Sequence, residues 1–146
     1  MTSYKNEAII DYPVEDIFKL FKKIAKRDFP KFNEKNPIGC KVERQVGSYS
    51  VKEGKMLVEI TGYEEYKLYE ITSRYNRTTY ISRYEFYPIN SESTRLVLTE
   101  KQSAYGMMSF LNDIIAGIFF KGRVRKRFKF FNKFLIEELQ KNTVST

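Results

Sequence analysis

The side chains that could do chemistry are a restricted set in this sequence, because histidine is absent and Cys40 is the single cysteine. A Ser-His-Asp triad and a Cys-His dyad both need an imidazole, and Cys/His zinc sites need several such ligands. The sequence therefore excludes these centres and also a disulfide framework. With no histidine to activate its thiol, Cys40 is interpreted as buried or chemically indifferent.

Carboxylates, lysines and tyrosines remain as candidates for acid–base catalysis. Glu70, Glu85 and Glu100 lie on segments predicted as strands, where each is expected on the solvent face, and no pair has a spacing that requires a joint role. The glycines form neither a GxGxxG fingerprint nor a P-loop. We therefore expect no catalysis, no cofactor and no metal site. An enzyme that uses Tyr and Glu stays open as an alternative.

Basic residues gather near the C-terminus. The chain has 26 basic and 18 acidic residues, a formal net charge of +8, and the segment from Lys121 to Lys133 holds seven of the basic residues and no acidic one. The rest of the chain is therefore close to neutral. A local basic patch favours an anionic partner more than uniform basicity does, although one solvated helix face would give the same pattern.

The same segment is predicted to form a long amphipathic helix. At about 100° per residue, five apolar residues fall within a narrow arc that should face a sheet: Val124, Phe128, Phe131, Leu135 and Leu139. The other side carries a basic face made of Arg123, Arg125, Lys126, Lys129 and Lys133. The sequence thus predicts one buried and one charged side for this helix.

Phe130 and Phe134 lie on or beside that basic face, and three interpretations fit them. The favoured one is that the helix is packed on more than one side and buries Phe130 or Phe134 against the first helix. The second is contact with an anionic membrane, in which rings enter the headgroup region and cations meet lipid phosphates. Single-stranded nucleic acid, bound by stacking and phosphate contacts, is the least favoured.

The remaining segments must position these residues. Tyr4 to Ile10 is predicted as a strand, and Pro13 is suited to the first turn of a helix whose apolar residues recur at helical spacing from Ile17 to Ile24. From Lys41 to Ser103 the apolar period changes to two, with turn residues spaced as in an antiparallel meander. The order of elements predicts an α+β fold with helices on one face of the sheet.

Length and composition bound the organisation of the chain. Its 146 residues, 42% apolar and 16% aromatic, are enough for one core, so residues 1–146 are expected to form a single domain. The first residues lack a basic end followed by an apolar run, and no apolar stretch reaches the length of about 20 residues that crosses a bilayer. We therefore expect a cytoplasmic protein; its oligomeric state stays open.

Three short stretches carry a family resemblance: Thr99-Glu-Lys-Gln-Ser-Ala-Tyr-Gly106, Leu111-Asn-Asp-Ile-Ile115 and Lys126-Arg-Phe-Lys129. Together with the order of elements, they resemble a domain of unknown function found mainly in Gram-positive bacteria, within the START-like (SRPBCC) superfamily. The resemblance implies a helix-grip fold, in which a curved antiparallel sheet of about six or seven strands wraps a long C-terminal helix, with an N-terminal helix after the first strand. It implies no known activity.

The resemblance also implies an internal cavity between the sheet and the C-terminal helix. Aromatic rings with a few hydroxyls would suit a lipid-like or aromatic ligand there. For any single tyrosine an ordinary core position is slightly favoured, and for the set the cavity is favoured. The expected lining comprises Tyr66, Tyr80, Tyr84, Phe86, Val124, Phe128, Phe131 and Leu135. Non-catalytic binding of a small hydrophobic or amphipathic ligand is therefore the leading hypothesis, ahead of a peripheral membrane or partner-binding module that uses the basic helix.

Overall fold

The computed structural model describes residues 2–48, 51–75, 78–104 and 121–144, and a few side chains at the ends of these ranges lie outside the description. In chain order the elements are β1 (Thr2–Ile10), α1 (Val14–Asp28), β2 (Lys41–Ser48), β3 (Val51–Glu64), β4 (Leu68–Tyr75), β5 (Thr78–Asn90), β6 (Ser93–Ala104) and α3 (Lys121–Val144). The predicted order of strand, helix, meander and long C-terminal helix is confirmed.

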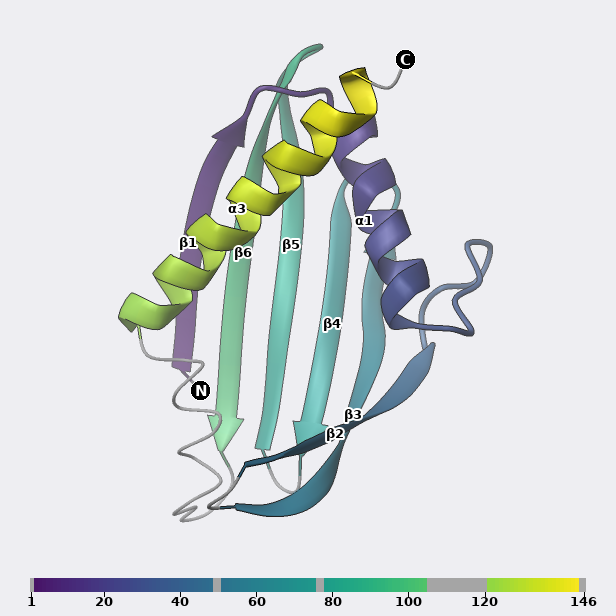
Figure 1. Ribbon diagram of the computed structural model, residues 1–146, viewed down its shortest axis with the longest axis vertical. Helices are drawn as coiled ribbons and strands as arrows, with labels where there is room; N and C mark the ends of the chain where they lie inside the picture. Colours follow the sequence, from purple (N-terminus) through teal and green to yellow (C-terminus); the bar gives the residue numbers. More distant parts are fainter. Residues whose placement is uncertain (1, 49–50, 76–77, 105–120, 145–146) are drawn as a thin grey trace.

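The strands form one antiparallel sheet in the order β1-β6-β5-β4-β3-β2. Strands β2 to β6 are a continuous meander, and β1 is the edge strand beside β6. Figure 1 shows both helices on the same face of the sheet, with α3 running diagonally from the β1 side towards the first turns of α1. The predicted α+β class and helix-grip arrangement are confirmed, with six strands in an open sheet. We call the helix-covered side the inner face.

Helix α1 begins as its sequence predicts. Pro13 takes the N-cap position, and Glu15 and Asp16 lie in the first turn, where the positive end of the helix dipole favours acidic side chains. Ile17 and Phe21 are completely or almost completely buried against the sheet. The apolar stripe of α1 therefore fixes this helix on the inner face.

An irregularity in β3 controls which side chains reach the inner face. The pairing of β3 with β4 shifts between Ile60 and Gly62, so that Ile60 opposes Ile71 and Tyr63 opposes Tyr69. A Cβ on Gly62 would lie 2.9 Å from the Cβ of Glu70 on β4, closer than such atoms approach in proteins. Glycine at position 62 is thus required by the close approach of the two strands.

Helix α3 packs through the predicted stripe. Phe128, Leu135 and Leu139 are buried in the main core, and Phe131 is half-buried against it. The Phe131 ring lies 5.8 Å, centroid to centroid, from the Phe21 ring of α1 in an edge-to-face arrangement. The phase predicted for this helix is confirmed for these four residues, whereas the side chain of Val124 lies outside the described part of the structure.

Phe128→Ala should lower the free energy of unfolding by about 3–5 kcal/mol, because it removes a buried ring and leaves a cavity. Lys129→Ala, on the exposed side of the same turn, should stay within about 0.5 kcal/mol of the wild type. Urea denaturation of the two variants measures both. Equal midpoints would contradict the rotation of α3 described above.

Gly62→Ala should lower the free energy of unfolding by about 1–3 kcal/mol, because the added methyl group overlaps Glu70 and forces the two strands apart. Thermal melting of this variant beside the wild type provides the comparison. A melting temperature unchanged by Gly62→Ala would show that the strands have more room at this position.

Candidate functional site

Cross-strand pairing brings tyrosines and one carboxylate, Glu100, together on the inner face of β5 and β6. Tyr84 pairs with Leu98, Ser82 with Glu100, and Tyr80 lies two residues further along β5. Directly opposed residues of an antiparallel pair point to the same side of the sheet. The prediction that Tyr80, Tyr84 and Phe86 share one face therefore agrees with the register of the strands.

Towards α1 this surface is apolar and aromatic. The Tyr84 ring lies 5.0 Å from the Phe21 ring of α1 and 5.6 Å from the Phe131 ring of α3, measured between centroids. Phe86 is buried beside them, with its centroid 4.9 Å from that of Phe21. Burial raises the pKa of the Tyr84 hydroxyl, which therefore stays neutral. A neutral phenol in this surface can donate or accept one hydrogen bond.

Further along β6 the inner face becomes charged. Glu100 is only 3% exposed, and Nη2 of Arg127 on α3 donates to its Oε1 at 2.6 Å and to its Oε2 at 2.7 Å. The prediction that Glu100 faces solvent is wrong. Leu96, Leu98 and Glu100 alternate along β6, so all three point inward, and a cation from α3 makes the burial of Glu100 tolerable. The other two glutamates of that prediction, Glu70 and Glu85, lie on the outer face, where they accept hydrogen bonds from Arg83 and Tyr87 respectively.

Burial perturbs the ionisable groups around this pair. It raises the pKa of Glu100, and the Arg127 guanidinium opposes that rise. Burial also raises the pKa of Tyr80, whose hydroxyl lies within electrostatic range of both Arg127 and Glu100. The site thus combines one ion pair with neutral phenols in a partly desolvated place.

A buried hydroxyl lies at the start of β5, on the same side of the strand as Tyr80. Thr78 is 1% exposed, and among the described residues its Oγ1 has no hydrogen-bond partner. Ser73, which pairs with Tyr80 across β4 and β5, is buried as well. Buried polar atoms are normally satisfied, so an orphaned hydroxyl indicates a place for a water molecule or a polar ligand group.

Sequence reasoning missed Glu100, Arg127 and Thr78 as members of the site. The signal for Glu100 was present, because it continues the inward alternation of Leu96 and Leu98. Its partner Arg127 on α3 lies 27 residues away along the chain, and no local sequence pattern predicts their contact.

Among the predicted cavity-lining residues, the structure brings most together and moves one away. Phe128 and Leu135 are buried, and Phe131 contacts Tyr84. Tyr66 was predicted on a strand, but it lies in the turn between β3 and β4. Its side chain is 40% exposed and its φ is 64°. The tight turn places its ring edge-on to Phe18, away from the Tyr80 region.

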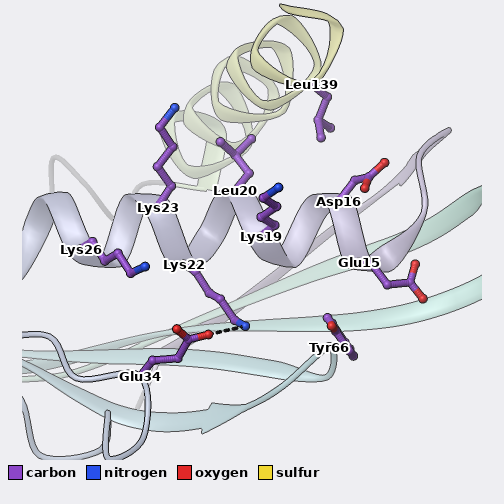
Figure 2. A pocket seen from close by; sticks show the side chains of 10 residues that line it. All are labelled: Glu15, Asp16, Lys19, Leu20, Lys22, Lys23, Lys26, Glu34, Tyr66 and Leu139. Carbon is purple, nitrogen blue, oxygen red and sulfur yellow. Dashed lines mark hydrogen bonds and ion pairs between the residues drawn. The ribbon is translucent and has the colours of Figure 1, made fainter. Parts of the chain in front are cut away.

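Two hollows in the described surface lie outside the predicted cavity. The larger, about 1020 Å³, is an open groove beside α1 whose lining includes Lys19, Lys23 and Leu139. Figure 2 shows Lys22 reaching from this groove to Glu34, an ion pair of 2.7 Å. The smaller, about 350 Å³, lies between β1 and α3: it is lined by Ser3, Tyr4, Lys5, Asn6 and Arg125. Neither is lined by the Tyr80 side chain or by Glu100, so the enclosed cavity stays a prediction.

The predicted basic face of α3 is exposed wherever the structure describes it. Its described members are Arg125, Lys126, Lys129 and Lys133; the side chain of Arg123 lies outside the description. Phe130 is 76% exposed, whereas Phe134 is half-buried against the core. The favoured interpretation, in which Phe130 or Phe134 is buried, is therefore wrong for Phe130 and agrees with the partial burial of Phe134. The place against α1 is taken by Phe131, about 100° away around the helix.

Metal sites and membrane-spanning helices are both absent from residues 2–48, 51–75, 78–104 and 121–144. These ranges contain no group of three acidic or cysteine side chains that could hold a metal ion. Within the same ranges, no helix combines the length and the apolar character needed to cross a bilayer. The Glu100–Arg127 ion pair on the inner face and the exposed side of α3 remain as candidate sites in the described part of the chain.

Comparison with solved structures places the fold. A START superfamily protein from Mycobacterium smegmatis superimposes with a TM-score of 0.63 at 10% identity, covering 95% of this chain and 97% of that one. A conserved protein from Geobacillus kaustophilus gives 0.62 at 17% identity, covering 96% of both chains. Ara h 8.0201 gives 0.60 at 10% identity, covering 99% of both. At these identities the likeness shows the fold, which is START-like.

Comparison with curated proteins found no match. A family model, described as "Domain of unknown function (DUF3284)", matches residues 5–121, from β1 to the first residue of α3. The match covers most of the chain, in agreement with the resemblance noted from its sequence. The chain therefore belongs to the DUF3284 family.

Proposed function

We propose that this protein binds a small amphipathic ligand, without catalysing a reaction, between the inner face of the sheet and α3. The apolar part of the ligand would lie against the aromatic surface formed by Tyr84 and Phe131, and its polar group would lie at the Glu100–Arg127 pair. START-like domains commonly bind small hydrophobic ligands, which supports the proposal as an analogy of fold.

The ion pair between the buried Glu100 carboxylate and the partly exposed Arg127 guanidinium is the observation that carries this proposal. Burial of the Glu100 carboxylate is costly, and the Arg127 cation offsets only part of that cost, so the pair is a weak source of stability. An apolar residue at position 100 would fill the same space at no such cost. Polar recognition accounts for the pair better, since a guanidinium beside a buried carboxylate can exchange part of that contact for a ligand oxygen.

The neutral hydroxyls restrict the chemistry of the ligand. Tyr80 and Tyr84 stay protonated because burial raises the pKa of each, and the Oγ1 of Thr78 is buried without a partner in the described structure. These groups and Arg127 suit hydroxyl, carbonyl or carboxylate oxygens. The expected ligand is therefore an apolar body with one oxygen-bearing end.

One observation favours the enzymatic alternative, and another opposes it. Glu100 has a pKa raised by burial, and Tyr80 lies within its electrostatic range, as a Tyr/Glu acid–base pair would require. Both carboxylate oxygens of Glu100, however, already accept hydrogen bonds from Arg127. An engaged carboxylate is a poor proton acceptor, so binding is the better-supported function.

The ligand proposal can be tested with anilinonaphthalene sulfonate, an amphipathic dye whose sulfonate can accept hydrogen bonds from Arg127. The wild type should bind it saturably, and Arg127→Met should weaken binding about tenfold, through loss of a charge-assisted hydrogen bond. Lys126→Met removes the same charge from the neighbouring, exposed position and should leave the affinity unchanged. Equal dissociation constants for the three proteins, measured by fluorescence titration, would contradict the proposed site.

Arg127→Met should also make stability depend on pH in a defined direction. Without Arg127, the pKa of buried Glu100 rises further, so the folded state binds a proton more readily than the unfolded state. Stability should then increase as pH falls from about 7.5 to about 5, and the deficit relative to wild type should shrink. Adding Glu100→Gln to Arg127→Met should remove the extra dependence of stability on pH, because the group that binds the proton is then gone. Urea melts of the single and double variants across that range measure it, and parallel pH profiles would refute it.

A further inference from the structure

The exposed side of the first half of α3 combines cations with an unburied ring. It consists of Lys126, Lys129, Phe130 and Lys133, which we call the basic aromatic face. These residues span an arc of about 100°, opposite the stripe through which α3 packs on the sheet. Phe130 is the most exposed large hydrophobic side chain among the described residues, at 76%. A single exposed ring is ordinary on a protein surface, so what distinguishes this face is the position of the ring among three lysines.

The charges of this face are uncompensated within the described structure. No described carboxylate lies within ion-pair distance of Lys126, Lys129 or Lys133. Glu137 lies one turn beyond Lys133 on the same side without pairing with it, and Glu138 pairs with Lys141 instead. The face therefore presents a local positive potential around an apolar ring.

The lysines of α1 provide a contrast within the same molecule. Lys22 contacts both Glu34 and Glu65, and Lys19 and Lys23 share the groove surface with acidic residues of the first turn (Figure 2). That surface is mixed in sign and has no ring as exposed as Phe130. A polyanion should therefore prefer α3 to α1.

We propose that the basic aromatic face of α3 docks onto an anionic lipid bilayer. With its axis parallel to the membrane, α3 would insert the Phe130 ring at the boundary between headgroups and acyl chains, and the three lysines would contact lipid phosphates. The charge complementarity and the single protruding ring carry this inference.

A bilayer fits the arrangement better than single-stranded nucleic acid does. Nucleic acid binding of that kind uses several rings on which successive bases stack along a groove. Here the neighbouring ring, Phe134, packs on Phe131 with centroids 6.4 Å apart and is half-buried. One ring flanked by cations one turn away in each direction, at Lys126 and Lys133, matches the pattern of an interfacial helix.

Docking through this face leaves the fold and the inner site unchanged. The stripe that contains Phe128 and Leu135 keeps its contacts with the sheet, because it lies on the opposite side of α3. The proposal is therefore independent of ligand binding at Arg127, and either can fail without the other. The face also lies outside the stretch matched by the family model, which ends at Lys121.

The test is co-sedimentation of the full chain with vesicles of phosphatidylcholine containing phosphatidylglycerol, and with vesicles of phosphatidylcholine alone. Wild type should bind the first and not the second, and binding should be lost between about 0.1 M and about 1 M salt, as the Debye length falls from about 10 Å to about 3 Å. The triple variant Lys126→Glu, Lys129→Glu, Lys133→Glu should bind at least about 100-fold more weakly, since each cation contributes about fivefold. The triple glutamine variant provides the same test if the glutamates impair folding.

A matched control separates this face from overall charge. The variant Lys19→Glu, Lys23→Glu, Lys26→Glu makes the same change in net charge on α1 and should keep most of the binding. Phe130→Ser should weaken binding while the melting temperature stays within about 2 °C of wild type. Equal losses from the two triple variants, or no binding of folded wild type to anionic vesicles, would overturn the proposal. So would a preference for single-stranded oligonucleotide that prevents vesicle binding and depends on Phe130.

Discussion

Burial of the apolar stripe of α3 against the sheet is the constraint from which the other functional features of this protein follow. With Phe128 and Leu135 fixed in the core, the helix has one rotation about its axis. That rotation brings Arg127 over the inner face, within reach of Glu100, and turns Phe130 to solvent. A helix rotated by one position would break the ion pair and bury the ring, so packing decides both surfaces at once.

The two charged regions of α3 differ in solvation, and this difference separates their roles. Glu100 and Arg127 meet at a buried carboxylate, where desolvation makes each contact specific and costly to leave unpaired. Lys126, Lys129 and Lys133 lie in water, where charges act over a Debye length and discriminate little between anions. The first arrangement suits recognition of one polar group, and the second suits attraction to an extended anionic surface.

Most aromatic side chains that the structure describes pack in or against the core. Phe21 of α1 is the centre of an edge-to-face cluster that reaches Tyr84 and Phe86 on β5 and Phe131 on α3. Such contacts join the two helices to the sheet. Among the described aromatic side chains, the 76% exposure of Phe130 is therefore an exception, and the large number of aromatic residues does not explain it.

The sequence by itself determined the order of elements, the buried stripes of α1 and α3 and the face shared by Tyr80, Tyr84 and Phe86, because helical and strand periodicities are local properties of the chain. It could not determine that Glu100 is buried, since a carboxylate enters a core only when a distant cation meets it there. The exposure of Phe130 likewise depends on tertiary packing. An aromatic residue beside a basic face can pack against a neighbouring helix or face water, and the place against α1 was already filled by Phe131.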